Sequence, residues 1–310
     1  MSIAWVTGAR GFIGRRLALA LRDQGLTVRG VGHGHLPPES WRQAGLTGWL
    51  NSQVGAEALG QLAAAGGRPD WVFHLAGGST VGGSLQAPFE DFTRTTSTTA
   101  SLLEWLRINA PRAKLIVASS AAVYGDTGGS HAEETQRPMP VSPYGYHKLM
   151  MELLCQEYSR VFGLETAILR LFSVYGDGLR KQLLWDCAGK LLGPGDRIEL
   201  GGTGAELRDW VHVDDAVSML QRIAPLATNQ CPIFNGGSGD GVTVREVVTL
   251  LATALQSPKQ ITFSQVCRAG DPGVLVCDAA RIAATGHRGQ VPLSTGIQRY
   301  ADWFKLARES

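Results

Sequence analysis

Short runs of apolar and β-branched residues alternate with stretches of helical periodicity through the first half of the chain. The strand-like runs are IAWVTG (3–8), LTVRGVG (26–32), PDWVFHLAG (69–77) and AKLIVASSAAVYG (113–125), and the helical stretches include RRLALALRDQG (15–25) and ASLLEWLRI (100–108). This alternation is typical of a parallel sheet with helices on both faces. We therefore expect an α/β protein built on a Rossmann-type, doubly wound parallel sheet.

The pattern changes after Gly176, where Gly and Pro become more frequent and the periodicity less regular, although EVVTLLATAL (246–255) is still helical in character. Such a shift in composition indicates a second structural unit. The sequence predicts a first domain at 1–172, to which a segment at about 207–238 returns. It also predicts a smaller C-terminal α/β lobe formed by 173–206 and 239–310.

Composition narrows the classes of function. The 310 residues are 44% hydrophobic and 18% charged, as in ordinary folded proteins, and 29 basic against 27 acidic residues leave a formal charge of only +2. Binding to a phosphate backbone needs a broad basic field, so we expect no nucleic-acid partner. No segment approaches the roughly 20 apolar residues that cross a bilayer, and no charged leader precedes the first strand. A cytoplasmic protein without a membrane partner is expected.

Cysteine spacing gives no sign of a metal site. The five cysteines form no CxxC pair, and no cluster of histidines lies near them in the sequence. Zinc sites usually show such spacing. We expect buried, reduced thiols and no bound metal.

A glycine-rich turn follows the first strand. TGARGFIG (7–14) places Gly8, Gly11 and Gly14 at three-residue spacing between a strand and a helix. Glycines permit a tight turn and close backbone approach, and the helix N-terminus offers free N–H groups to a pyrophosphate. An isolated glycine triplet is often only a turn, but this strand-turn-helix context predicts a dinucleotide site.

The end of the second strand bears on which dinucleotide binds. NAD sites usually carry an acidic residue there for the ribose 2′-hydroxyl, whereas this chain has Gly32 and His33, and Arg10 of the glycine turn could reach the same space. These residues favour NADP(H), with NAD as the alternative. Under the other interpretation, His33 and His35 are ordinary exposed loop residues.

The stretch SPYGYHKLMMELL (142–154) predicts the start of a helix. Ser142 can cap it and Pro143 suits its first position, so Tyr144 lies near the start and Lys148 one turn later. The pair is either a catalytic acid with its charge partner or a surface pair on an ordinary helix. His147, about 100° from each around the helix, is expected to be structural or exposed.

Tyr144 and Lys148 share a helical stripe with Met151, Cys155 and Phe162, which predicts that the pair faces inward. A cation about 4 Å from a phenol, at an effective dielectric of about 20, contributes about 4 kcal/mol. That energy would lower the phenol pKa from about 10 to about 7. We expect Lys148 to lower the pKa of Tyr144, so that Tyr144 exchanges a proton with a hydroxyl or ketone oxygen.

A serine supplies the third element. The strand AKLIVASS ends at Ser119 and Ser120, and the carboxyl end of a parallel strand faces the ligand crevice. There the hydroxyl of Ser120 can hold the reacting oxygen beside Tyr144. This combination favours the catalytic interpretation over the surface pair.

With these motifs, the chain resembles the extended short-chain dehydrogenase/reductase family, which contains NAD(P)-dependent nucleotide-sugar epimerases, dehydratases and 4-ketoreductases. The resemblance covers nearly the whole chain. Its motifs are TGARGFIG (7–14), HLAGGSTVGGS (74–84), SSAAVYG (119–125), YGYHK (144–148), RLFSVYG (170–176), RDWVHVDD (208–215), FNGGSG (234–239) and RAGDP (268–272).

The resemblance implies a catalytic triad of Ser120, Tyr144 and Lys148. It implies that the first domain binds NAD(P) and that the C-terminal lobe binds a nucleotide-diphosphate sugar, with two arginines on the diphosphate. The expected cofactor-binding residues are Gly8, Arg10, Gly11, Phe12, Ile13, Gly14, His33, Leu75, Ala76, Gly77, Tyr144 and Lys148. The expected substrate-binding residues are Ser79, Ser120, Ser173, Arg208 and Arg268.

Departures from the family pattern reduce the number of reactions that we expect. The dehydratases have an Asp–Glu pair after the catalytic Ser or Thr, but this chain has Ala121 and Ala122, so dehydration is not expected. The asparagines usual at two substrate-side positions are Ser173 and Thr95 here, which puts the substrate contacts in question.

Because an acidic residue is missing at Gly32, we expect NADPH-dependent reduction of the C4 ketone of a nucleotide-activated 4-keto-6-deoxy sugar. The alternative is an NAD-dependent nucleotide-sugar 4-epimerase, which the same triad would serve. A third hypothesis, a non-catalytic NADP-binding sensor or scaffold, would not need Ser120, Tyr144 and Lys148 together. The family commonly forms dimers through two helices per subunit, which implies a homodimer.

Overall fold

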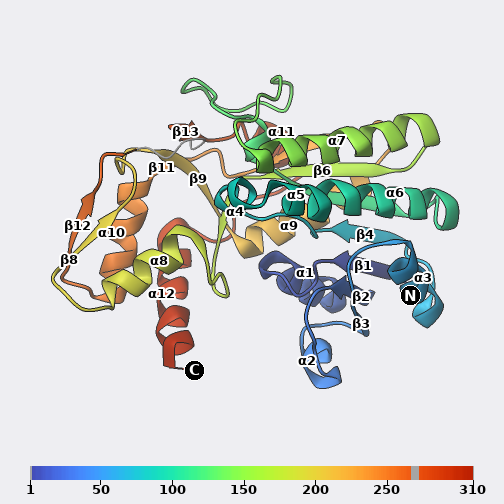
Figure 1. Ribbon diagram of the computed structural model, residues 1–310, viewed down its shortest axis with the longest axis horizontal. Coiled ribbons are helices and arrows are strands. Elements are labelled where there is room, and N and C mark those ends of the chain that lie inside the picture. Colours follow the sequence, from blue (N-terminus) through green and yellow to red (C-terminus); the bar gives the residue numbers. More distant parts are fainter. Residues whose placement is uncertain (1, 267–271, 310) are drawn as a thin grey trace.

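The structure is a computed structural model that describes residues 2–266 and 272–309. Seven parallel strands form the central sheet, in the order β10-β6-β5-β4-β1-β2-β3 (Figure 1). The order reverses on either side of β1, as in doubly wound sheets. The strands are β1 (Ile3–Thr7), β2 (Thr27–Gly32), β3 (Gly48–Asn51), β4 (Trp71–His74), β5 (Lys114–Ser120), β6 (Thr166–Leu171) and β10 (Ile233–Gly236). The predicted Rossmann-type α/β fold is confirmed.

Helices cover both faces of this sheet. On one face α1 (Phe12–Asp23) packs beside α9 (Val213–Ile223), and on the other lie α3 (Ala56–Gly66), α6 (Thr98–Asn109) and α7 (Pro143–Phe162). Alternate strand residues point to opposite faces. Residues of the α1/α9 core include Ala4, Val6, Phe73 and Ile116, and residues of the other core include Trp5, Val72, Leu115 and Val117. Burial on both faces explains the nearly continuous apolar runs of these strands.

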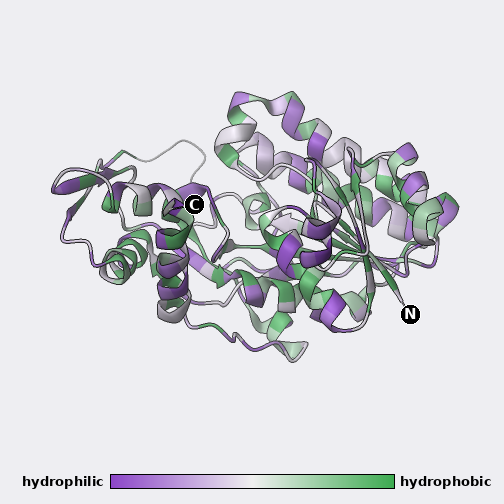
Figure 2. Ribbon diagram, turned by 90° about the horizontal axis from the view of Figure 1, so that it is seen from below, coloured by the Kyte–Doolittle hydropathy of each residue, from purple (hydrophilic) through white to green (hydrophobic). Residues whose placement is uncertain are grey.

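A smaller lobe lies beside the sheet (Figures 1 and 2). Its core is formed by α8 (Gln182–Leu191), α10 (Val244–Leu255) and α12 (Leu293–Glu309), with the paired strands β8 (Arg197–Leu200) and β12 (Gln260–Phe263). A four-stranded sheet centred on β9 connects the parts; its strands are β7 (Ser173–Tyr175), β9 (Leu207–His212), β11 (Gly241–Thr243) and β13 (Val274–Leu275). The short elements are α2 (Pro38–Gln43), α4 (Val81–Gln86), α5 (Pro88–Phe92), η1 (Thr93–Ser97), η2 (Ala121–Val123), η3 (Ala224–Leu226) and α11 (Ala280–Ala284).

The segment expected to return to the first domain supplies α9, which packs against α1, and β10, which pairs with β6. The preceding strand, β9, belongs to the connecting sheet. The exact domain boundaries stay a prediction. No helix in the described part of the chain combines the length and apolar character needed to cross a membrane.

The helix of the catalytic motif begins as the sequence predicts. Ser142 Oγ accepts a hydrogen bond from the backbone N–H of Gly145 at 3.2 Å, Pro143 occupies the first turn, and Gly163 ends α7 in the left-handed conformation, with φ of 76°. This local chemistry fixes where α7 starts, and therefore where its first two turns lie relative to the sheet edge.

The inward stripe of α7 is confirmed for Lys148, Met151 and Cys155, which are buried, but not for Phe162. Phe162 is 47% exposed because its ring packs at the C-terminal end of the helix, against Tyr158 and beside a guanidinium group rather than against the sheet. The stripe therefore describes the first three turns of the helix only.

A buried ion pair connects α7 to the sheet. The carboxylate of Glu152 on α7 accepts hydrogen bonds from Arg170 Nη2 (2.7 Å) and Nε (3.0 Å) on β6, and from Ser119 Oγ (2.5 Å) on β5. Glu152 is completely buried and Arg170 nearly so. Glu152 is not part of the stripe of Lys148, Met151 and Cys155, and its pairing with Arg170 accounts for its burial.

Replacing Glu152 by Ala should lower the free energy of unfolding by about 3–5 kcal/mol, because it leaves the Arg170 guanidinium buried without its partner. Urea unfolding followed by circular dichroism measures this loss. Glu157→Ala, on the exposed side of the same helix, should change it by less than about 0.5 kcal/mol. Equal losses in the two variants would show that the ion pair does not hold α7 to the sheet.

Candidate active site

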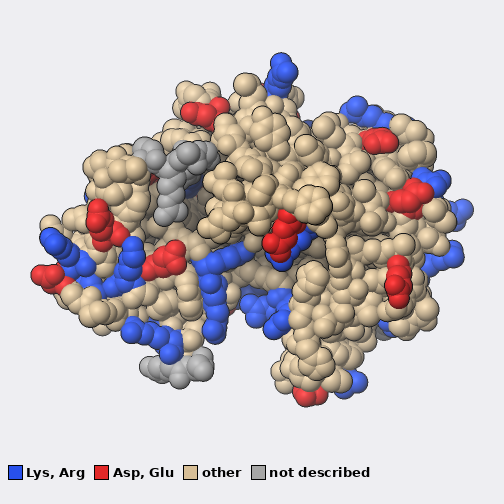
Figure 3. All heavy atoms as spheres, in the orientation of Figure 1, with Lys and Arg blue, Asp and Glu red and all other residues tan. Residues whose placement is uncertain are grey.

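A cleft of about 1820 Å³ opens at the carboxyl ends of β1, β4 and β5 and extends to the lobe. Basic side chains gather along this hollow (Figure 3). Every predicted site residue within the described part of the chain lines it; Arg268 lies outside the described residues. These lining residues are Gly8, Arg10, Gly11, Phe12, Ile13, Gly14, His33, Leu75, Ala76, Gly77, Ser79, Ser120, Tyr144, Lys148, Ser173 and Arg208. The structure thus brings together residues that are up to 200 positions apart.

The glycine turn has the form of a phosphate cradle. Gly8 has a φ of 69°, and a Cβ atom on Gly14 would lie 2.3 Å from the carbonyl oxygen of Gly8. Gly11 caps α1 without a side-chain hydrogen bond, so the first N–H groups of this helix remain for a ligand. These features fit a dinucleotide pyrophosphate at the positive end of the helix dipole.

A buried histidine fixes the adjacent turn. The Thr99 hydroxyl donates its proton to a backbone carbonyl, so it must accept the hydrogen bond from His74 Nε2 (3.0 Å). The proton of the neutral ring is therefore on Nε2, and His74 Nδ1 accepts from Thr7 Oγ1 (2.8 Å). The same Thr7 oxygen accepts from the backbone N–H groups of Leu75 and Ala76. Burial lowers the pKa of His74 to about 3, so the neutral ring keeps this tautomer and holds the turn in place.

The residues at the end of β2 lie beside the guanidinium group of Arg10. The Arg10 side chain lies against Gly34, where a Cβ atom would be 1.6 Å from Arg10 Nη1. Gly32 and His33 line the same cleft. A ribose in this position would meet a guanidinium group and no carboxylate from the end of β2.

Ser120, Tyr144 and Lys148 meet at the sheet edge. Ser120 ends β5 and lies close enough to Tyr144 for a side-chain hydrogen bond. Lys148 Nζ donates to the carbonyl oxygen of Ala118 at 2.9 Å. A Cβ atom on Gly77 would lie 3.6 Å from the same Nζ atom. A phenol, a hydroxyl and an ammonium group therefore converge on the floor of the cleft.

The pKa of Tyr144 differs from the expectation. Burial raises it, a hydrogen bond from Ser120 partly offsets that rise, and Lys148 does not lower it. The reason is geometric: Lys148 Nζ is 6.0 Å from the centroid of the Tyr144 ring and directs a proton to a backbone carbonyl. Burial also lowers the pKa of Lys148 itself to about 8, against the opposing effect of nearby carboxylates.

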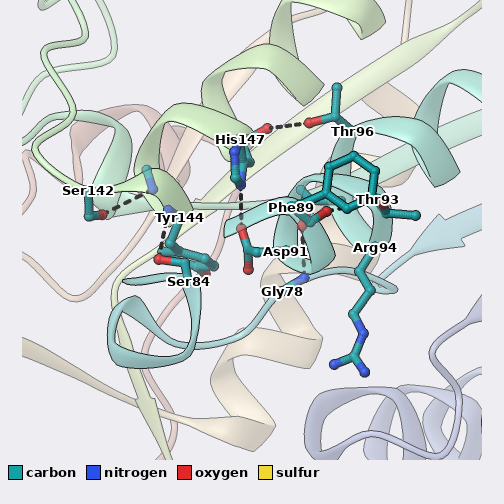
Figure 4. Close-up of polar contacts among 12 residues, drawn as sticks. Gly78, Ser84, Phe89, Asp91, Thr93, Arg94, Thr96, Ser142, Tyr144 and His147 are labelled. Carbon is teal, nitrogen blue, oxygen red and sulfur yellow. Dashed lines mark hydrogen bonds and ion pairs between the residues drawn. The ribbon is translucent and has the colours of Figure 1, made fainter. Parts of the chain in front are cut away.

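One of those carboxylates belongs to a buried pair that the sequence did not reveal. Asp91 on α5 accepts a hydrogen bond at 2.6 Å from Nδ1 of His147, which follows Tyr144 by three residues on α7 (Figure 4). Both side chains are buried, so of the two expectations for His147 the structural one holds. The Asp91 charge raises the pKa of both Tyr144 and Lys148. No spacing marked Asp91, because it is 56 residues from His147.

The structure also shows where Thr95 and Ser173 lie, the two residues that replace asparagines of the family pattern. Thr95 is buried, and its hydroxyl accepts from the backbone N–H of Gly78 at 2.8 Å, which anchors the turn after β4. Ser173 lines the cleft at the start of β7, and Ala121 and Ala122 follow Ser120 without any acid or base. Small side chains therefore occupy these four positions near the triad.

Comparison with known proteins agrees with this geometry. Residues 4–237 match the model of the NAD dependent epimerase/dehydratase family. The chain belongs to this family. Its assignment to the extended short-chain dehydrogenases/reductases is thereby confirmed, since the homologues include nucleotide-sugar 4-epimerases of that family.

Among its relatives in the epimerase/dehydratase family is the UDP-glucose 4-epimerase of Azospirillum brasilense, 29% identical over 89% of this chain and 84% of that protein. The crystal structure of the Thermotoga maritima UDP-glucose 4-epimerase with UDP-glucose is similar with a TM-score of 0.88, at 26% identity over 99% of each chain. The Bacillus cereus UDP-glucuronic acid 4-epimerase with UDP-glucuronic acid and NAD has a TM-score of 0.87, at 25% identity over 98% of this chain and 99% of that one.

Replacing Asp91 by Asn should move the pH profile of turnover of the nucleotide-sugar substrate. Removing the carboxylate charge removes an interaction that raises the pKa of Tyr144 and Lys148, so both values fall. Both limbs of kcat/KM against pH should shift to lower pH by about 1 unit at most. A purely structural role for Asp91 would lower the rate at all pH values without moving the limbs.

The matched control for Asp91→Asn is Glu90→Gln. It removes the same charge from the neighbouring residue, an exposed partner of Arg94. Its profile should coincide with that of the wild-type protein.

Proposed function

We propose that the protein is a UDP-sugar 4-epimerase that inverts the configuration at C4 of its substrate with a nicotinamide dinucleotide as resident cofactor. One observation carries the proposal: Ser120, Tyr144 and Lys148 converge between the glycine turn of α1 and a basic cleft wall that includes Arg208. Chains related over nearly this whole length are named as 4-epimerases.

In this proposal the ionised phenol of Tyr144 takes the proton of the C4 hydroxyl and later returns it, and Ser120 holds the same oxygen by a hydrogen bond. Burial raises the pKa of Tyr144, so the ionised fraction, and with it the rate, grows as the pH rises towards that pKa. Lys148, buried but cationic, stabilises negative charge that develops on this oxygen. A nicotinamide dinucleotide held at the turn of Gly8, Gly11 and Gly14 would supply the hydride chemistry at C4. Ala121 and Ala122 offer no acid or base for the loss of water, which is consistent with a reaction that ends at C4.

The comparisons support this alternative better than the expected 4-ketoreductase, because the relatives reported above are 4-epimerases. The reductase interpretation depended on the missing acidic residue at Gly32, and that observation concerns the cofactor, not the direction of hydride transfer. A sensor or scaffold without catalysis would leave Tyr144, Ser120 and Lys148 without a purpose.

For the cofactor, similar structures such as the Bacillus cereus complex contain NAD, and the relatives described above give no support for NADP. The position of Arg10 against Gly34 nevertheless provides a guanidinium group where the 2′-phosphate of NADP would lie. We propose NAD as the resident cofactor, with NADP as a second ligand of the same site.

We also propose a homodimer formed through α7. Four exposed apolar residues lie along one side of this helix at spacings of four, three and eight residues, with Glu157 between the last two: Tyr146, Met150, Leu153 and Val161. Such spacing is typical of helix pairs that bury a seam against a partner.

Purified protein should interconvert UDP-glucose and UDP-galactose without added cofactor. Chromatography of the nucleotide sugars measures the rate. Tyr144→Phe should lower this rate by at least about a hundredfold, because the proton acceptor is lost, while the dinucleotide stays bound. The control Tyr146→Phe, on the exposed side of α7, should retain the rate. Cofactor released by heating is identified as NAD or NADP.

Consumption of NADPH with a 4-keto-6-deoxy nucleotide sugar, without any interconversion at C4, would establish the reductase instead. Full activity of the Tyr144→Phe variant would show that both catalytic interpretations are wrong.

Replacing Leu153 by Asp should convert the protein to a monomer, because it introduces a charge in the middle of the proposed seam. Light scattering after gel filtration measures the molar mass. Leu306→Asp introduces the same charge at another exposed leucine, on α12, and should leave the dimer intact. A monomeric mass for the wild-type protein at micromolar concentration would contradict the dimer.

A further inference from the structure

A short segment of the lobe reaches across the cleft to the first domain. Residues 177–181, which we call the strap, lie between β7 and α8 and line the cleft (Figure 1). Leu179 is buried in the lobe core, and its carbonyl oxygen accepts a hydrogen bond from Tyr300 Oη on α12 at 3.0 Å. Gly178, with a φ of 99°, approaches α1 so closely that a Cβ atom would lie 3.0 Å from Arg15 Nη2. The strap is therefore held by the lobe and lies against the first domain.

Both ends of the strap form polar contacts with the first domain. At one end Asp177 pairs with Arg16 on α1. At the other end Lys181 Nζ donates to Ser79 Oγ, in the turn after β4, at 2.8 Å. We call these two contacts the latches. They join the lobe to two separate loops at the carboxyl edge of the central sheet.

These two loops flank the expected path of a dinucleotide. Arg16 is in the second turn of α1, the helix that follows the glycine turn and the expected pyrophosphate site. Ser79 is two residues after Gly77, and a Cβ atom on Gly77 would lie 3.6 Å from Lys148 Nζ. A dinucleotide that extends from the glycine turn to Lys148 therefore runs along the strap, between its two latches.

A strap in this place affects the exchange of the cofactor. A 4-epimerase uses the same dinucleotide for both hydride transfers, so loss of the cofactor between them would end turnover. Contacts that hold a covering segment closed slow the exit of the ligand beneath it. Because both latches join protein groups to each other and not to the dinucleotide, they slow its entry as well.

We propose that the Asp177–Arg16 and Lys181–Ser79 latches hold the strap closed over the dinucleotide, so that cofactor exchange requires both latches to open. The proposal rests on the proposed 4-epimerase function of the same cleft. It assigns to these four residues the retention of the cofactor, separate from the proton transfer at Tyr144.

Cofactor exchange measures the latches without any turnover. Protein loaded with NADH is mixed with a large excess of NAD, and the loss of nicotinamide fluorescence gives the dissociation rate. Asp177→Asn and Lys181→Met should each raise this rate at least about threefold, and the two changes together at least about tenfold, because the latches are independent. The association rate should rise as well, so that the dissociation constant changes less than about threefold.

Double variants test whether each pair acts as a unit. Arg16→Gln should add nothing to the effect of Asp177→Asn, because the latch is already broken. Ser79→Ala should likewise add nothing to the effect of Lys181→Met.

Two matched controls should exchange NADH at the wild-type rate. Asp23→Asn breaks an exposed arginine–aspartate pair at the other end of α1. Lys190→Met removes a lysine charge from the other end of α8.

The strap is refuted if Asp177→Asn and Lys181→Met release NADH at the wild-type rate. It is also refuted if dissociation accelerates while association is unchanged, because these side chains would then contact the dinucleotide itself. Wild-type protein that shows the latch effects but interconverts no UDP-sugar would contradict the 4-epimerase and leave the strap standing. Interconversion by wild-type protein, with unchanged NADH exchange in both variants, would contradict the strap alone.

Discussion

The catalytic edge of this protein depends on keeping one ammonium group charged in its interior. Lys148 is almost fully buried, and burial favours its neutral form. A backbone carbonyl of β5 and the charges of Asp91 and Glu152 act against this effect. Each of these carboxylates is paired in turn, Asp91 with His147 and Glu152 with Arg170. The charge on Lys148 is thus maintained by two buried pairs, one on each side of α7.

This arrangement explains why α7 carries so many polar groups on its inward side. A core helix would ordinarily bury apolar residues, and buried ion pairs are seldom more stable than the hydrophobic residues that could replace them. Within three turns α7 nevertheless buries His147, Lys148 and Glu152, and it places Tyr144 at the cleft. Met151 and Cys155 supply the apolar contact with the sheet core. The helix therefore buries fewer apolar side chains than an ordinary core helix, and its buried polar groups fix the electrostatic environment of the Tyr144 phenol.

The sequence predicts those features that depend on local chemistry. The glycine turn, the capped start of α7 and the serine at the end of β5 are each encoded within a few residues, so their meeting at one sheet edge follows from the parallel fold. Asp91 escaped prediction because it reaches His147 from α5, through packing that no spacing encodes. The pKa of Tyr144 is raised, although the sequence predicted that Lys148 would lower it. Desolvation of the phenol depends on packing, and Lys148 lies further from the phenol than the distance of about 4 Å that the prediction assumed.

The division between a rigid sheet edge and a separate lobe suits a reaction that needs both faces of a sugar. Tyr144 and Ser120 are fixed on the sheet side, whereas Arg208 and Lys181 come from β9 and from the segment before α8. In the proposed epimerase, the sugar must turn over while its diphosphate stays bound, so contacts to the ring must be adaptable.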